Sequence, residues 1–449
     1  MNYLNQEDTI CAIATGGNMS AIAIIRISGN KAIKITNSIF NKDISNVKTH
    51  TIQYGNIINN KNVIDEVLIS IYKKNKSFTG EESVEISCHG SLYIQNKIIQ
   101  LLIEKGCRIA NPGEFSMRAF KNGKIDLSQA ESIEDLISSQ SKKAHEIALK
   151  QLRGGFSNKL KNLRNQLIDF ASLIELELDF SEEDVEFANK EQFENLVKLI
   201  KKELHLLIES FKLGNVIKNG ISVAIIGAPN VGKSTLLNCL LNEEKAIVSE
   251  IAGTTRDIIE DKLNIEGFTF RFIDTAGIRK TSDTIENIGI KKTLDKAKNS
   301  HVILYLIEAT SDIENQLKRL NKKSKEKTII VVNKIDLKPK IKNNYKNVIF
   351  ISAKNKVGID SLKESLLNFV NMKNLSDNDN IITNLRHYNE LKLTLKEINE
   401  IIKGLDNEMT GDFLSINIRQ ALFHLGSITG EVTTDDLLGN IFSKFCIGK

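Results

Sequence analysis

The spacing of hydrophobic residues changes along this chain of 449 residues, and each change predicts a different kind of structure. Over residues 1–120, short runs rich in β-branched side chains alternate with turns of Gly, Asn and Lys, which is typical of strands. One helix is expected within this region, at Leu92–Glu104. From 121 to 219, apolar residues such as Leu160 and Leu163 recur every three or four positions, which predicts long helices.

Residues 220–372 show a third pattern, in which apolar runs of strand length alternate with helical stretches. This alternation is typical of a mostly parallel sheet covered by helices. We therefore expect a multidomain α/β protein, with an α+β N-terminal domain at 1–120 and an inserted domain at 220–372. The stretches 121–219 and 373–449 both have helical spacing and are expected to pack as one discontinuous helical domain. Within it, Ser128–Glu131 resembles a capping box and predicts a helix start there.

The stretch Gly227–Thr235 carries the strongest functional signal in the chain. It follows the apolar run Ile221–Ile226 and precedes the helical segment Leu236–Leu241, which is the context of a phosphate-binding loop. Backbone N–H groups of such a loop and the positive end of the helix attract phosphates. Lys233 is expected to reach the outer phosphates, and the Ser234 hydroxyl is expected to bind Mg²⁺.

Two further motifs complete the predicted phosphate and metal site. Asp274–Gly277 follows a predicted strand, so its carboxylate can bind Mg²⁺ through water and its last N–H can meet a γ-phosphate. Gly253–Asp257 lies between the loop and this motif, and we assign Thr255 to the Mg²⁺ ion. Ile278 stands where Ras-like proteins carry a water-orienting Gln, so hydrolysis needs another device. Asn230 offers an oxygen to a monovalent cation that would stand in for an arginine finger.

Asn333–Asp336 ends the next predicted strand and indicates guanine specificity. A carboxylate there accepts hydrogen bonds from the ring N–H and the exocyclic amine of guanine, and adenine lacks that donor pair. Ser352–Lys354 is expected to close the base pocket. Together with the phosphate loop, these motifs predict an inserted P-loop GTPase (G) domain that resembles GTPases of the translation-factor class.

Composition limits the remaining function classes. Lys and Arg number 61 against 56 Asp and Glu, and this near balance permits an RNA partner through a local patch without arguing for one. The five cysteines form no Cys-x-x-Cys pair, so neither a zinc site nor a disulfide framework is expected. The chain shows no signal-peptide pattern and no apolar run of about 18 residues. This predicts a protein without a membrane partner that is cytoplasmic, or that lies in an organelle matrix if a transit peptide has been removed.

The whole chain resembles the tRNA modification GTPase family MnmE, also called TrmE. The most specific match is the stretch Phe445–Lys449, which is similar to the Cys-x-Gly-Lys ending of that family. The loop 16–21 and Ser91 depart from the family pattern near the expected folate pocket. Further matches are Phe78–Glu81, Pro112–Ser116, Arg118–Phe120, Gly253–Asp257, Thr429–Glu431 and Asp435–Gly439.

The resemblance implies a homodimer formed through the N-terminal domain. That domain would bind a reduced folate, with 5,10-methylenetetrahydrofolate as one-carbon donor and 5-formyltetrahydrofolate as its analogue. A heterotetramer with the FAD-dependent partner MnmG would add an aminomethyl or carboxymethylaminomethyl group to C5 of the wobble uridine of certain tRNAs. K⁺ would bring two G domains together and promote GTP hydrolysis.

The resemblance also assigns residues to these roles. Glu286 would orient the attacking water, Lys233 would act on the phosphates, and Cys446 is a candidate catalytic thiol. The folate contacts would be Arg26, Glu85, Lys124 and Lys449. The K⁺ ligands would be Asn230, Ser249, Ile251 and Thr254. The nucleotide contacts would be Asn230, Val231, Gly232, Lys233, Ser234, Thr235, Ser249, Glu250, Ile251, Ala252, Gly253, Thr254, Thr255, Asp274, Thr275, Ala276, Gly277, Asn333, Lys334, Ile335, Asp336, Ser352, Ala353 and Lys354.

Two alternatives stay open. Arg26 lies in an apolar strand, which indicates either a bound anion or a buried ion pair. The G-domain motifs fit equally well a ribosome-assembly or signalling GTPase that performs no chemistry on RNA. Such a switch needs neither a folate-binding domain nor the ending Cys446–Lys449.

Overall fold

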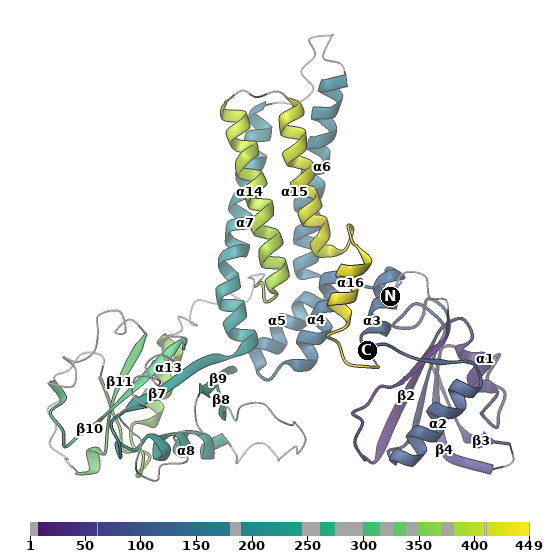
Figure 1. Ribbon diagram of the computed structural model, residues 1–449, viewed down its shortest axis with the longest axis horizontal. Helices are drawn as coiled ribbons and strands as arrows, with labels where there is room; N and C mark the ends of the chain where they lie inside the picture. Colours follow the sequence, from purple (N-terminus) through teal and green to yellow (C-terminus); the bar gives the residue numbers. More distant parts are fainter. Residues whose placement is uncertain are drawn as a thin grey trace. The chain divides into compact units, whose positions relative to one another are not determined.

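The computed structural model describes residues 8–60, 62–179, 190–244, 261–273, 300–314, 327–337, 348–369, 381–407, 409 and 411–448. The chain forms two compact units. Unit 1 consists of residues 1–137, 148–205 and 386–449, and unit 2 of residues 138–147 and 206–385. Both predicted helical stretches thus contribute to unit 1, whereas the predicted G domain falls within unit 2 (Figure 1).

The N-terminal part of unit 1 is a six-stranded sheet with two helices packed on one face (Figure 1). Its elements are β1 (Ile10–Ile13), β2 (Ile22–Ser28), α1 (Ala32–Asn37), β3 (Thr51–Asn59), β4 (Asn62–Tyr72), β5 (Ser83–His89), α2 (Leu92–Glu104) and β6 (Arg108–Ile109). The strand order is β3-β4-β5-β2-β1-β6, and every pairing is antiparallel except that of β1 with β6. Ile33 of α1 and Leu102 of α2 belong to the core beneath the helices, and the predicted helix Leu92–Glu104 is confirmed.

The rest of unit 1 is helical, and its helices come from both ends of the chain. They include all or part of α3 (Glu114–Lys121), α4 (Leu127–Ser138), α5 (Lys142–Leu152), α6 (Gly155–Asp179), α7 (Lys190–Asn219), α14 (Leu385–Asp406), α15 (Gly411–Thr429) and α16 (Asp435–Phe442). Helix α6 packs along α15, which confirms the discontinuous helical domain (Figure 1). The rings of Phe170 on α6 and Phe193 on α7 stack with their centres 3.7 Å apart. None of the helices that the structure describes combines the length and the apolar character needed to cross a membrane.

The predicted cap of α4 is wrong in one respect. The helix begins at Leu127, so Ser128 lies inside the first turn, where its hydroxyl donates to Asp126 Oδ1 at 2.9 Å. Asp126 Oδ1 also accepts the Gln129 N–H at 3.0 Å and therefore performs the capping. An ionised carboxylate accepts such bonds more strongly than a hydroxyl does. Glu131, the expected last member of the box, is buried instead.

Glu131 joins the two halves of the helical domain. Its carboxylate accepts hydrogen bonds from Arg386 Nε at 3.0 Å and Nη2 at 2.7 Å, and Oε2 lies 2.6 Å from His387 Nε2. Arg386 also donates to the backbone oxygen of Ser427 near the end of α15, at 2.7 Å. Burial by itself raises the pKa of the Glu131 carboxyl, but the charges and hydrogen bonds of His387 and Arg386 outweigh it and lower the pKa to about 2.

This cluster predicts sensitivity to acid. The pKa of Glu131 is about 2 in the folded chain against an ordinary value of 4.5, so its stabilisation is complete above pH 4.5 and is lost as the pH falls towards 2. The difference corresponds to about 3 kcal/mol in the free energy of unfolding. Urea unfolding followed by circular dichroism at several pH values should show this loss in the wild-type chain and not in Glu131→Gln.

A matched control for that experiment lies on α14. Glu400→Gln removes the partner of Lys403, whose ammonium lies 2.7 Å away in an exposed pair. Exposed pairs contribute about 0–1 kcal/mol, so this variant should keep the pH profile of the wild-type chain. If Glu131→Gln kept that profile too, Glu131 would not be the source of the acid sensitivity.

Unit 2 contains a second six-stranded sheet, which is parallel apart from a hairpin at one edge. Its elements are β7 (Ile221–Gly227), α8 (Lys233–Glu244), β8 (Asp261–Ile265), β9 (Phe268–Ile273), β10 (Val302–Glu308), β11 (Thr328–Asn333), the 3₁₀ helix η1 (Ile335–Leu337), β12 (Val348–Phe350) and α13 (Ile359–Phe369). The strand order β12-β11-β10-β7-β9-β8 confirms the mostly parallel sheet. Strands β9 and β8 lie on one side of β7, and β10 lies on its other side. The order of strands therefore reverses at β7, and parallel sheets bind ligands at the carboxyl end of the strand where this reversal occurs.

Candidate functional site

The phosphate loop connects β7 to α8 in a backbone conformation that its sequence permits. Asn230 has a φ of 58° and Gly232 a φ of 97°, both in the left-handed region. A Cβ atom at Gly232 would lie 2.3 Å from Asn333 Nδ2, so only glycine fits there. The Lys233 ammonium donates to the backbone oxygens of Gly227 at 2.8 Å and Ala228 at 3.1 Å, which holds its charge at the loop.

Asn333 braces this loop from the neighbouring strand β11. Its side chain is 1% exposed, its Nδ2 donates to Val231 O at 2.9 Å, and its Oδ1 accepts the Ala353 N–H at 3.0 Å. One amide thus connects the phosphate loop to the stretch Ser352–Lys354. We predicted both segments as nucleotide contacts, and the structure brings them together.

Asp336 lies in η1, directly beyond β11. The Ser352 hydroxyl donates to Asp336 Oδ1 at 2.6 Å. This hydrogen bond, with the nearby charges of Lys354 and Lys334, lowers the pKa of the Asp336 carboxyl below its usual value and keeps it an acceptor. Lys334 has a φ of 64° and pairs at 3.1 Å with Glu308, a residue at the end of β10 that the motifs did not reveal.

A second cluster lies on the N-terminal sheet. Arg26 and Glu85 are direct neighbours on β2 and β5, and Arg26 Nη2 lies 2.8 Å from Glu85 Oε1. The guanidinium carbon is 5.7 Å from the centre of the Phe115 ring and 6.0 Å from that of Phe78. The two charged side chains are 25% and 23% exposed, so the structure shows the ion-pair alternative, with one side open to solvent. Lys124 donates to Asn75 O at 2.8 Å, on the loop that carries Phe78.

The C-terminal tail is docked against the N-terminal domain. Arg26 Nη1 donates to Gly448 O at 3.3 Å, and the Gly113 N–H donates to Cys446 O at 3.3 Å. Gly448 has a φ of 94°, and a Cβ atom on it would lie 2.5 Å from Ile13 O. The Phe445 side chain is buried in a core with α3, α4 and α16, whereas Cys446 is exposed. The structure therefore brings the predicted residues Arg26, Glu85 and Cys446 into one region.

Two family models together match nearly the whole chain. The model described as GTP-binding protein TrmE N-terminus matches residues 9–124, and the model described as MnmE helical domain matches residues 127–446. The chain belongs to the MnmE family of tRNA modification GTPases. The resemblance inferred from the motifs is thus confirmed.

Curated MnmE relatives align over the full length of this chain. The tRNA modification GTPase MnmE of Cytophaga hutchinsonii is 53% identical over 453 residues, which cover 99% of this chain and 98% of that protein. The protein of the same name from Flavobacterium johnsoniae is 53% identical over 463 residues, or 99% of both chains. That from Bacteroides thetaiotaomicron is 50% identical over 465 residues. Among solved structures, the G domain of the FeoB iron transporter of T. maritima is 24% identical to this chain and has a TM-score of 0.26. The match covers 33% of this chain and 98% of that G domain.

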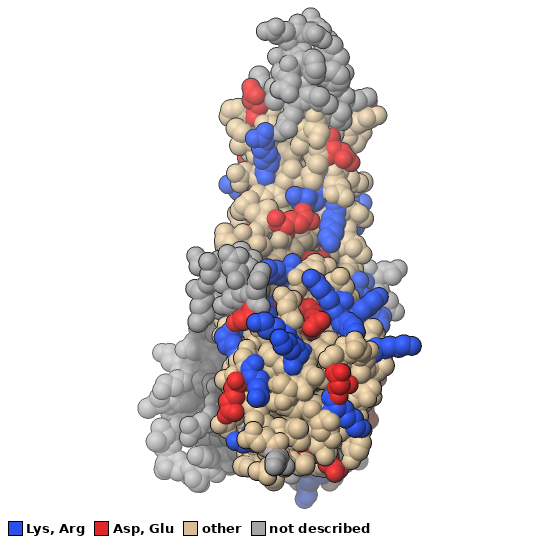
Figure 2. Space-filling model, turned by 90° about the vertical axis from the view of Figure 1, so that its right-hand side faces the viewer, with Lys and Arg blue, Asp and Glu red and all other residues tan. Residues whose placement is uncertain are grey.

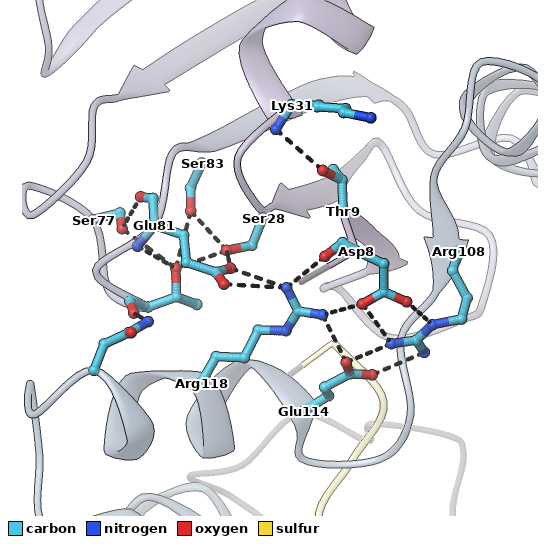
Figure 3. A network of polar contacts seen from close by, with 12 residues as sticks. Asp8, Thr9, Ser28, Lys31, Ser77, Glu81, Ser83, Arg108, Glu114 and Arg118 are labelled. Carbon is cyan, nitrogen blue, oxygen red and sulfur yellow. Dashed lines mark hydrogen bonds and ion pairs between the residues drawn. The ribbon is translucent and has the colours of Figure 1, made fainter. Parts of the chain in front are cut away.

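Residues of the motifs that this chain shares with the MnmE family also take part in a charge network around the buried side chains of Arg118 and Glu114 (Figure 3). Arg118 is 3% exposed and lies 2.9 Å from Glu114, 2.8 Å from Asp8 and 3.2 Å from Glu81. Arg108 pairs with Glu114 at 2.6 Å. Burial alone raises the pKa of Glu114, but the hydrogen bonds of Arg108, Asn111 and Arg118 outweigh it, so the pKa is lowered. We matched these motifs by resemblance and assigned them no role; the structure gives them the role of fixing α3 and the loop before β5.

Part of the predicted MnmE site lies outside the residues that the structure describes. This applies to residues 249–255, to Asp274–Gly277 with Ile278, to Glu286 and to Lys449. Ser234 and Thr235 lie in the first turn of α8. The described part of the site therefore consists of the phosphate loop, the guanine motif and the cluster around Arg26.

Proposed function

We propose that this MnmE-family GTPase uses GTP hydrolysis to drive modification at C5 of the wobble uridine of certain tRNAs. It acts in the cytoplasm, in a heterotetramer with the FAD-dependent partner MnmG. A reduced folate supplies the carbon of the aminomethyl or carboxymethylaminomethyl group. The observation that carries the proposal is the Arg26–Glu85 pair with the C-terminal tail docked on it, in a chain that matches the family from end to end.

The described residues of the G domain fit a guanine nucleotide. The left-handed residues of the phosphate loop and the ammonium of Lys233 suit a phosphate chain. Ser234 would bind Mg²⁺ together with Thr255, and the ion would offset phosphate charge. Glu286 would orient the attacking water. The K⁺ ligands would be Asn230, Ser249, Ile251 and Thr254.

The cluster around Arg26 fits a folate. The guanidinium of Arg26, the carboxylate of Glu85 and the ring of Phe115 gather at one place, which suits a flat heterocycle with polar edges. Lys124 and Lys449 would add positive charge for the carboxylates of the folate tail. The Gly113 N–H donates to the backbone oxygen of Cys446 and keeps this residue near the cluster, and its exposed thiol is our candidate for a catalytic group.

The sheet of the N-terminal domain supports the proposal of a homodimer. Tyr54 and Leu68 are direct neighbours on β3 and β4, and they are 56% and 46% exposed. Ile52 on the same face is 63% exposed. An exposed group of large apolar side chains on one sheet face favours association with a second copy of the chain.

Nucleoside mass spectrometry of tRNA from a strain that lacks the chain tests the proposed function. The modified wobble uridine should disappear and should return with the wild-type gene. Glu85→Gln should fail to restore it, whereas Glu104→Gln, which makes the same change at the exposed end of α2, should restore it. Unchanged nucleosides in the deletion strain would defeat the proposal and favour a GTPase switch without RNA chemistry.

Equilibrium dialysis with 5-formyltetrahydrofolate examines the folate step by itself. The wild-type chain should bind the folate, and Glu85→Gln should weaken binding by about 10- to 100-fold, because hydrogen bonds to a charged group are lost. Glu104→Gln should bind as the wild-type chain does. A wild-type chain that binds no folate would remove the folate donor from the proposal.

A further inference from the structure

Positive charge is concentrated in the N-terminal domain. Residues 8–124 contain 15 Lys and Arg against 9 Asp and Glu, a formal charge of +6, whereas the whole chain carries +5. Lys and Arg side chains are prominent over the lower part of the surface in Figure 2, which belongs to this domain. Such an excess attracts polyanions.

Three lysines belong to one turn of this domain. Lys73, Lys74 and Lys76 lie within residues 73–78, which we call the basic loop, between β4 and β5. The Lys76 N–H donates to Lys73 O at 2.9 Å, the Asn75 N–H donates to Gly80 O at 2.8 Å, and the Lys124 ammonium donates to Asn75 O at 2.8 Å. Within the part of the chain that the structure describes, no carboxylate pairs with the ammonium groups of the three loop lysines.

The basic loop is anchored to the charge network around Arg118 that Figure 3 shows. The Ser77 hydroxyl donates to Glu81 O at 2.6 Å, and the hydroxyls of Thr79 and Ser28 lie 2.7 Å apart. Glu81 itself is held by Arg118. The lysines therefore project from a rigid support, which reduces the conformational entropy lost when a partner binds.

An aromatic ring lies between the loop lysines and the cluster around Arg26. Phe78 is 42% exposed, and its ring centre is 6.0 Å from the guanidinium carbon of Arg26. An exposed ring among cationic side chains is how proteins bind unpaired RNA, since ammonium groups contact phosphates and the ring stacks on a base.

We propose that the basic loop binds the anticodon arm of tRNA. The lysines contact phosphates, and an unpaired base stacks on Phe78, which places the RNA beside the cluster around Arg26. This inference rests on the proposed function, because it supplies the docking surface for the tRNA substrate.

Salt titration of tRNA binding by the full-length chain tests the inference, with an unmodified transcript that carries a wobble uridine. The variant Lys73→Gln/Lys74→Gln/Lys76→Gln should reduce the slope of log affinity against log salt by about 2, since each lost single-strand phosphate contact removes about 0.7. Phe78→Ala should weaken binding by about 5- to 150-fold with little change in slope, and Phe78→Tyr should restore it.

The control variant Lys34→Gln/Lys97→Gln/Lys105→Gln removes the same charge from α1, from α2 and from the residue directly after α2. It should keep the salt slope of the wild-type chain. If the two triple variants reduced the salt slope equally, net charge alone would attract the tRNA, and the assignment of the loop would be overturned. Dissociation of a dimer in the loop variant, seen by sedimentation, would assign the loop to self-association and overturn it too.

The outcomes also separate this inference from the proposed function. If the wild-type chain binds tRNA and the loop variant binds equally well, the loop assignment fails alone. If the wild-type chain binds no tRNA at low salt, the loop assignment fails and the partner in the proposed function is contradicted as well. Nucleoside analysis of the deletion strain then decides independently whether the chain serves tRNA modification.

Discussion

Asp336→Asn should convert the G domain from a guanine-selective site into one that prefers xanthine. The carboxylate accepts two hydrogen bonds from guanine, whereas an amide accepts one and donates one, which matches the ring N–H and the C2 oxygen of xanthine. The Ser352 hydroxyl, which lies 2.6 Å from Asp336 Oδ1, can support either group because it both donates and accepts. The ratio of kcat/KM for GTP over xanthosine triphosphate should fall by about 10⁴-fold.

Steady-state hydrolysis with the two nucleotides checks this prediction. Asp360→Asn is the matched control, because Asp360 lies on α13 of the same unit and its side chain is 98% exposed. It removes the same charge and should leave the nucleotide preference unchanged. If Asp336→Asn retained the preference for GTP, the base would have to be read by another group.

The sequence predicts the position of a G-domain motif when that motif directly follows a strand of the parallel sheet. Gly227 ends β7 and Asn333 ends β11, and the ends of parallel strands meet at one edge, so motifs that follow strands converge there. Strand β8 escaped prediction because polar residues alternate along it, as they do on an edge strand. The hydrogen bond from Asn333 to Val231 O was also missed. The motif shows that an amide side chain is present, but it does not show which backbone group that amide contacts.

In the N-terminal domain, the sequence identifies charged residues but not their partners. Arg26 in an apolar strand was unusual, yet its partner Glu85 lies 59 residues away and is defined by strand register. The pair of Arg118 and Glu81 spans 37 residues in the same way. Ion pairs between distant segments depend on how the segments pack, and no local pattern encodes that. The Asp126 cap was missed for a local reason, because Ser128 matched the capping pattern equally well.

Potassium should accelerate GTP hydrolysis strongly over sodium at equal ionic strength. Ile278 cannot orient water, so the transition state needs positive charge from elsewhere, and an arginine finger in that role is worth about 10³- to 10⁵-fold. Asn230 is exposed on the phosphate loop with a φ of 58°, a conformation that Asn tolerates, and its amide oxygen is our proposed K⁺ ligand. Phosphate release in KCl should therefore exceed that in NaCl by about 10³-fold or more.

Two substitutions separate the oxygen of Asn230 from its backbone conformation. Asn230→Gly keeps the left-handed φ without strain but removes the ligand, so it should bind GTP and lose the potassium effect. Asn230→Asp retains an oxygen at the same position and should keep the effect. Equal rates in the two salts for the wild-type chain would exclude a potassium-assisted mechanism, and stimulation that persists in Asn230→Gly would move the ligand to other residues. Because both variants leave the positive φ at position 230 accessible, a loss confined to the glycine variant reports on the missing oxygen and not on a distorted loop.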